Sequence, residues 1–222
     1  MVGVKNKVHF YFLRIIHIVL YIPNDIKYIL RWLRSIRFKK KFNPIIQEIP
    51  WITFRAKKWL DNYLKPNMSL FEFGCGGSTL YFSKKVKEVV SIEHNKKYYN
   101  AIFKIMKQKN ISNCDLQLID VPKLNKSNID IYNSSAKKYA MSISKFPNGY
   151  FDLIFIDGIE RNPCIKFAIK KIKQGGFLML DNSRKEKWQE GVNMLNKYVR
   201  VDFLGVGQNH PYVWQTSIWK IK

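Results

Sequence analysis

The chain has 222 residues, which is room for one domain of ordinary size and an appendage. Hydrophobic residues make up 46% and aromatic residues 15%, so the chain can bury a full core and is not a disordered protein. A net charge of +23 makes an anionic partner, nucleic acid or phospholipid, a candidate. Three widely spaced cysteines exclude a CxxC zinc site and a disulfide framework, and they favour a reducing, cytoplasmic location.

The N-terminal part is basic. The apolar run Val8–Ile22 is interrupted by charge and is shorter than the ~20 residues of a spanning helix. Asn24–Phe42 is predicted to be a basic amphipathic helix that Asn24 caps. Residues 1–42 hold ten Lys and Arg against one acid, Asp25, a net +9. Two interpretations remain open: a peripheral anchor on an anionic membrane, or a helical cover packed on the domain with a solvated basic face.

Pro44 and Pro50 bracket a linker, so residues 1–50 are expected to be a basic helical extension and residues 51–222 the main domain. The pattern then predicts, in order, a helix at Thr53–Leu64, a strand at Ser69–Phe73, a helix at Ser78–Val86, a strand at Glu88–Glu93, a helix at Asn95–Lys109, a strand at Leu116–Ile119, a polar connection at Pro122–Asn148, a strand at Tyr150–Asp157, a helix at Pro163–Lys173, a strand at Phe177–Asp181 and a helix at Lys185–Lys197.

Strands that alternate with helices indicate βαβ units and a parallel sheet. The tail differs, because the strand-like runs Tyr198–Gly205 and Tyr212–Ile221 are joined by a loop too short for a crossover helix. These two runs must therefore pair antiparallel. The predicted fold is α/β: a doubly wound, mostly parallel seven-stranded sheet with an antiparallel C-terminal strand pair and a helical N-terminal extension.

A glycine-rich turn follows the first predicted strand. Gly74 and Gly76 let the backbone turn tightly and approach a ligand. Glu93 ends the next strand, nineteen residues after Gly74, where an acid in doubly wound sheets binds ribose hydroxyls. Glu72 stands two residues before Gly74; its charge would repel a pyrophosphate but suits an ammonium group. This favours S-adenosylmethionine over a dinucleotide.

Cys75, inside the turn and without a paired base, is expected to fill space there rather than act as a nucleophile.

The segments EFGCGGST, VVSIEH, FDLIFIDG and GGFLMLDNS resemble class I, Rossmann-like S-adenosylmethionine-dependent methyltransferases over Trp51 to Lys222. Ser78 stands where that family often has a third glycine. The resemblance implies S-adenosylmethionine as the cofactor and a seven-stranded fold whose last strand inserts into the sheet. It implies that Glu72, Gly74, Cys75 and Gly76 surround the methionine part of the cofactor, that Glu93 binds the ribose, that Asp120 meets the adenine, and that Asp157 lines the same pocket.

A second, partial resemblance is to metal-dependent O-methyltransferases. Asp157, Asp181 and Asn182 end two predicted strands, and such an oxygen cluster suits Mg²⁺ or Ca²⁺. The family has a lysine three residues after its first Asp, whereas this chain has Glu160. In the alternative interpretation no metal binds: Asp157 lines the pocket, and Asp181 and Asn182 cap the following helix.

His210 lies in the loop before the last predicted strand, near the expected substrate mouth, and together with Asp157 it is a candidate catalytic base. Trp214 and Trp219 alternate with apolar residues and are expected in the core.

The favoured function is O-methylation of a small-molecule or glycan acceptor, near a membrane if the N-terminal helix anchors there. The alternatives are a nucleic-acid methyltransferase that uses the basic surface and a non-catalytic interaction module.

Overall fold

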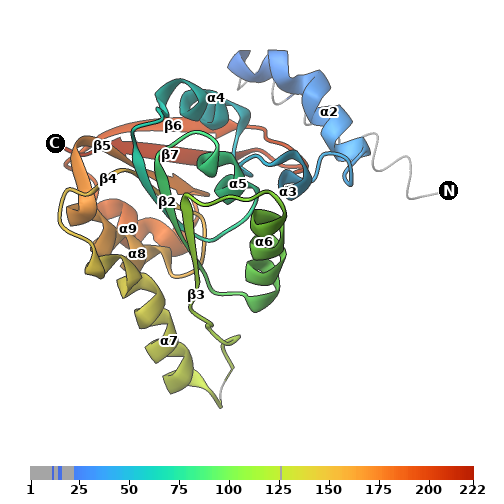
Figure 1. The fold of residues 1–222 in the computed structure, drawn as a ribbon. Helices are drawn as coiled ribbons and strands as arrows, with labels where there is room; N and C mark the ends of the chain where they lie inside the picture. The colour runs from blue at the N-terminus through green and yellow to red at the C-terminus, as the bar shows by residue number, and fades with distance from the viewer. Residues whose placement is uncertain (1–11, 13–14, 17–22, 126) are drawn as a thin grey trace.

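The computed structural model describes residues 12, 15–16, 23–125 and 127–222. Most of the apolar run Val8–Ile22 therefore lies outside the described residues. A seven-stranded sheet runs through the middle of the molecule (Figure 1) in the order β3-β2-β1-β4-β5-β7-β6. The strands are β1 (Ser69–Phe73), β2 (Glu88–Glu93), β3 (Cys114–Leu118), β4 (Phe151–Ile156), β5 (Ile172–Asp181), β6 (Val199–Gly205) and β7 (Trp214–Lys220).

The pairing of these strands confirms the predicted fold class. β1 to β5 are parallel to one another, and β7 is inserted antiparallel between β5 and β6. The strands β1 and β4 are buried along nearly their whole length, because helices cover both faces of the sheet. Trp219 on β7 is 1% exposed, as expected for a core residue.

Two layers of helices enclose the sheet. On one face of the sheet, α4 (Phe54–Tyr63) and α5 (Gly77–Ser83) pack over the first core. On the same face α6 (Lys96–Gln108) packs against α5 and the sheet through a smaller cluster. The other core packs α7 (Ile129–Met141), α8 (Arg161–Ala168) and α9 (Gln189–Asn193) on the opposite face. Adjacent residues of β1 divide between them: Leu70 faces the first core, and Phe71 faces the second.

Three predicted elements differ from the structure. The polar connection Pro122–Asn148 contains α7, whose Tyr132, Ala136 and Tyr139 recur at helical spacing and pack on the second core. Frequent Ser, Asn and Lys residues on its exposed side conceal that pattern. The last predicted helix, Lys185–Lys197, is shorter, because a 3₁₀ turn and then α9 replace it. β5 begins at Ile172, ahead of the predicted start.

The described N-terminal segment packs on the domain. In place of one helix over Asn24–Phe42 the chain forms a 3₁₀ helix (Pro23–Tyr28), α2 (Ile29–Arg37) and, after a turn, the short α3 (Pro44–Gln47). The predicted start at Asn24 lies within the 3₁₀ helix, and α2 begins after Tyr28 without a side-chain cap. Trp32 is fully buried, and the carboxylate of Asp25 accepts a hydrogen bond from the Val206 amide at 2.8 Å. Among the described helices, none has the length and apolar character needed to cross a bilayer.

Candidate functional site

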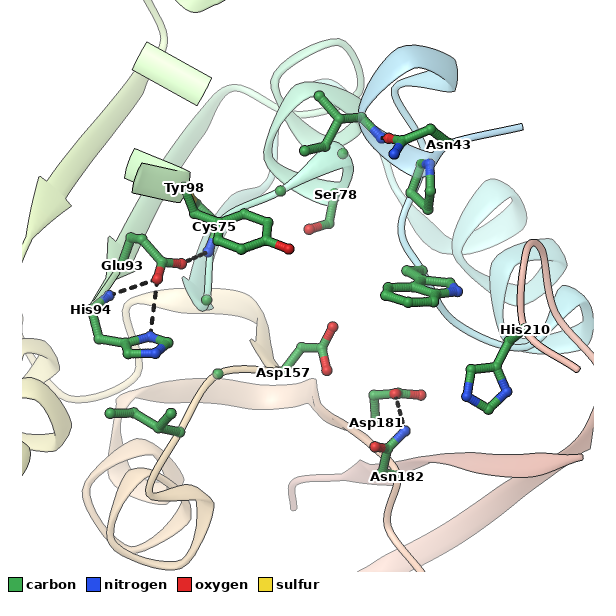
Figure 2. A pocket seen from close by; sticks show the side chains of 18 of the residues that line it. Asn43, Cys75, Ser78, Glu93, His94, Tyr98, Asp157, Asp181, Asn182 and His210 are labelled. Atoms are coloured by element: carbon green, nitrogen blue, oxygen red, sulfur yellow. Dashed lines mark hydrogen bonds and ion pairs between the residues drawn. The ribbon is translucent and has the colours of Figure 1, made fainter. Parts of the chain in front are cut away.

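A cavity of about 470 Å³ opens at the carboxyl ends of β1, β2, β4 and β5. Ligands of doubly wound sheets bind at this edge. Figure 2 shows Glu93 and Tyr98 on one side of the cavity, His210 on the other, and Asp157 and Asp181 between them. The wall consists of residues 43–45, Trp51, residues 74–78, Glu93, His94, Tyr98, residues 157–159, Asp181, Asn182, His210 and Trp214.

The glycine turn between β1 and α5 forms the floor of the cavity. Gly74 has φ +96°, and a Cβ there would lie 2.8 Å from the Gly158 Cα, so only glycine fits. A Cβ on Gly77 would collide with the backbone of Pro44, which shows how closely the N-terminal segment covers this turn. The Gly76 amide donates to Thr79 Oγ1 at 3.0 Å and fixes the start of α5. Gly74, Cys75 and Gly76, three of the predicted site residues, all line the cavity.

Glu93, at the end of β2, is 3% exposed and lines the cavity. Its Oε2 accepts the Cys75 amide at 2.8 Å, and its Oε1 accepts the Asn95 amide at 2.6 Å. Burial alone would raise the pKa of Glu93, but the nearby His94 ring and these amides hold it below its usual range. A carboxylate has about four lone-pair sites, so Oε2 keeps capacity for a ligand hydroxyl.

Glu72 lies beneath the turn and does not line the cavity. It is fully buried, and its Oε2 accepts hydrogen bonds from Thr79 at 2.6 Å and Ser91 at 2.7 Å. Burial raises its pKa to about 7. Its other oxygen has no partner among the described residues. The geometry therefore gives Glu72 a role in holding the turn from below, through Thr79.

Asp120, predicted to meet the adenine, is exposed and lies outside the cavity wall. On the Glu93 side of the cavity the wall instead contains Tyr98, at the start of α6 (Figure 2). Sequence reasoning passed over Tyr98 although it follows Glu93 by five residues, because an aromatic residue on an amphipathic helix also fits a core position.

Asp157 and Asp181 lie at the ends of β4 and β5, and the buried guanidinium of Arg161 ties these ends together. Arg161 donates to Asp157 Oδ1 at 2.9 Å, to the Asp157 carbonyl at 2.7 Å, to the Gly158 carbonyl at 3.0 Å and to the Asp181 carbonyl. Burial raises the pKa of Asp157, Asp181 raises it further, and Arg161 opposes both effects. Asp157 is thus held at the middle of the cavity wall, with one oxygen paired to a fixed cation.

The predicted metal set of Asp157, Asp181 and Asn182 does not fit a divalent cation. Asp181 Oδ1 already accepts from Trp214 at 2.9 Å and Thr216 at 2.6 Å. Asp181 Oδ2 accepts from the Asn182 amide group, and the Arg161 cation is paired with Asp157. The described residues also contain no cluster of three or more His, Cys, Asp or Glu side chains able to hold a metal. The positive charge at these strand ends comes from arginine.

His210 and two tryptophans form the far side of the cavity. The His210 ring lies 4.7 Å from the Trp214 ring and 6.0 Å from the Trp51 ring, centroid to centroid. Burial lowers the pKa of His210, so the ring is neutral near pH 7. The prediction that Trp214 is a core residue is wrong, because Trp214 lines the cavity and donates to Asp181. It stands at the first position of β7, where the strand meets the cavity.

Part of the wall comes from the segment predicted to be a linker. Asn43, Pro44 and Ile45 line the cavity beside the glycine turn. Trp51 Nε1 donates to the Gln208 carbonyl at 2.7 Å, which fixes the indole next to His210. The two prolines around this segment predicted an extended connection, and nothing in the local pattern indicates that it folds back over the site.

No protein-family model and no curated protein matches the sequence. Solved structures do match. A Streptococcus mutans protein assigned as a methyltransferase and solved in complex with SAH is 15% identical, with a TM-score of 0.54 over 75% of this chain and 96% of that chain. An rRNA methylase from Streptococcus thermophilus is 14% identical, with a TM-score of 0.54 over 76% of this chain and 95% of that chain.

A precorrin-6y C5,15-methyltransferase from Geobacter metallireducens is 16% identical, with a TM-score of 0.51 over 75% of this chain and 88% of that chain. At such identities the likeness concerns the fold. The chain has the class I, Rossmann-like fold of S-adenosylmethionine-dependent methyltransferases.

Proposed function

We propose that this protein is an S-adenosylmethionine-dependent methyltransferase whose acceptor is a small molecule or a glycan. The observation that carries the proposal is the cavity itself. It joins the glycine turn and Glu93 at one end to His210 and Asp157 at the other. Its volume of about 470 Å³ falls within the range of ~300–1,000 Å³ typical of ligand pockets.

The cofactor would lie along the glycine turn. Glu93 Oε2 supports this placement because it is a fixed, ionised acceptor with spare capacity, as ribose hydroxyls require. Tyr98 and His94 border the same end and offer ring surfaces to the adenosine. Gly74 and Gly76 leave the backbone open to the methionine part. S-Adenosylmethionine supplies an activated methyl group, so the protein has to align the acceptor and exclude water.

The acceptor would enter on the side of His210, Trp51 and Trp214. An oxygen nucleophile must lose a proton, and a neutral His210 ring can accept it. Asp157 is the second candidate base; its pairing with Arg161 also suits it to orienting the acceptor hydroxyl. The predicted metal set at the strand ends does not fit a divalent cation. We therefore assign the deprotonation to a side-chain base, with His210 as the first candidate and Asp157 as the second.

A nucleic-acid acceptor is the second candidate. The charge of +23 and the likeness to an rRNA methylase fold favour it. Phosphate contacts fall off steeply with salt, so RNA retention measured against ionic strength separates this candidate from a small-molecule enzyme.

The test is methyl transfer from labelled S-adenosylmethionine to panels of glycans, small hydroxylated molecules and RNA, with Glu93→Gln run in parallel. The proposal predicts label in a glycan or small-molecule fraction that disappears with the variant. Label in RNA alone would move the assignment to the second candidate. Label in no fraction, together with absent cofactor binding, would contradict both.

A further inference from the structure

The exposed side of α2 carries arginines and large apolar side chains together. Arg31, Arg34 and Arg37 are exposed, while Trp32, Ser35 and Ile36 on the other side are buried. Leu30 lies within the exposed arc and is 71% exposed, and Phe38, directly after the helix, is 52% exposed. We call Leu30, Arg31, Arg34, Arg37 and Phe38 the α2 face. A helix that only covered the domain would not need two large apolar groups on its solvent side.

The cations around this face are not paired with carboxylates of the described residues. Among the residues that the structure describes, none of the exposed cations between 27 and 41 forms an ion pair; these are Lys27, Arg31, Arg34, Arg37, Lys39, Lys40 and Lys41. The two acids nearby are used elsewhere, since Asp25 is buried against Val206 and Glu48 pairs with Lys84 and Lys109. The positive charge of the α2 face is therefore free to meet an anionic partner.

Apolar exposure is concentrated in the same part of the chain. Of the sixteen large hydrophobic side chains reported as exposed among the described residues, seven lie between Phe12 and Trp51. Ile46 on α3 is 66% exposed, directly beside Ile45, which lines the cavity. Trp51 is 46% exposed and also lines the cavity. Exposed apolar side chains thus occur along the chain from α2 to residues next to or in the cavity wall.

The buried side of α2 holds the loop that carries His210. Trp32 Nε1 donates to the His210 carbonyl at 2.8 Å, and Ser35 Oγ accepts the Asn209 amide at 2.9 Å. A partner bound to the α2 face would therefore contact the same helix that holds the loop of His210, the candidate base.

We propose that the α2 face docks this protein on an anionic phospholipid bilayer. Arginines meet the lipid phosphates, and Leu30 and Phe38 enter the boundary between headgroups and acyl chains. Exposed aliphatic side chains contribute nothing to binding a phosphate backbone, so the combination favours a membrane over RNA. The docking itself is independent of the proposed reaction. Its consequence, an acceptor presented by the membrane beside the cavity rim, rests on the proposed function.

The test is co-sedimentation of the full chain with phosphatidylcholine vesicles that contain or lack phosphatidylserine. We expect binding only to the anionic vesicles. R31Q/R34Q/R37Q should bind about 100-fold more weakly, because each cation near an anionic membrane surface adds to the binding free energy. The matched control is K104Q/K137Q/K138Q, which removes the same charge from exposed lysines of α6 and α7 and should bind like the parent.

A second variant tests the apolar contribution. L30S/F38S keeps every charge, and it should lose the vesicle binding that persists at high salt. Thermal unfolding of each variant checks that the fold is intact. Equal loss of binding in the control, or unchanged binding in both α2 variants, would overturn the proposal. So would salt-sensitive retention on RNA that the arginine variant abolishes and L30S/F38S leaves intact, in the absence of vesicle binding. None of these outcomes depends on methyl transfer.

Discussion

The two ends of the cavity are built in different ways. At the end that we propose for the cofactor, which we call the cofactor end, Gly74, Cys75, Gly76 and Glu93 come from one β-turn-α-β stretch, and the hydrogen bond from the Cys75 amide to Glu93 spans 18 residues. At the opposite end, which we propose for the acceptor and call the acceptor end, the wall comes from the N-terminal segment, the ends of β4 and β5, the β6–β7 loop and the start of β7. The first end is built mainly within one stretch of the chain, with Gly158 and Pro44 packed against its turn, and the second depends on contacts across the whole fold.

The contacts that hold the acceptor end span the chain. Trp32 reaches His210 across 178 residues, and Trp51 reaches Gln208 across 157. Such contacts exist only once the domain and the N-terminal segment have packed together. Substitutions at the two ends should therefore separate: cofactor binding should fail at one, and turnover at the other.

The largest effect is expected at the acceptor end. His210→Gln removes the candidate base and should lower kcat by about 10²–10⁴-fold. Cofactor affinity, measured by calorimetry, should stay within a few-fold, because His210 lies across the cavity from Glu93 (Figure 2). Since burial lowers the pKa of His210, the parent should lose kcat/KM only at a pH below the usual histidine pKa of 6.5, where the ring becomes protonated. An unchanged acid limb in the variant would assign the base to another residue.

At the cofactor end, Gly74→Ala should destabilise the fold by about 2–5 kcal/mol, the sum of a left-handed backbone and a clash with Gly158. The matched control is Gly149→Ala, where φ is also positive but nothing lies within 4 Å of the added Cβ. It should cost only about 1–2 kcal/mol. Chemical denaturation measures both. Equal losses would show that the close approach of Gly74 to Gly158 contributes nothing.

Glu93→Gln should weaken S-adenosylmethionine binding about 10–100-fold, because hydrogen bonds to a charged acceptor contribute about 1.5–3 kcal/mol. Glu88→Gln is the control on the same strand: Glu88 starts β2, away from the cavity, and accepts from Ser69 at 2.6 Å and Tyr150 at 2.8 Å. It should leave affinity unchanged. Parallel losses in the two variants would indicate damage to β2 rather than loss of a ligand contact.

The smallest effect on cofactor binding is expected at Glu72. Its folded pKa of about 7 lies above the ordinary 4.5, so between these values the folded state keeps a proton that the unfolded chain releases. Stability should fall as pH rises through this window and then level off. Glu72→Gln should remove that decline, on the order of 3 kcal/mol, while cofactor affinity stays within a few-fold. A large loss of affinity would mean that Glu72 contacts the ligand after all.

The sequence predicts the cofactor end of the cavity better than the acceptor end. The strands of the mostly parallel sheet, the antiparallel tail and the glycine turn were predictable because hydrophobic period, loop length and glycine geometry are local signals. Trp51, Tyr98 and Trp214 were not predicted as site residues, since each also fits a core or linker position until tertiary packing is known. α7 was missed because polar residues on its exposed side outnumber its buried stripe.

The central claim is that the glycine turn and Glu93 form a binding site for S-adenosylmethionine. The most direct measurement is an isothermal titration of the full chain with this ligand, with Glu93→Gln alongside. The account predicts saturable binding at one site per chain that the variant weakens at least about tenfold. No heat at millimolar ligand, or binding that the variant leaves unchanged, would contradict it.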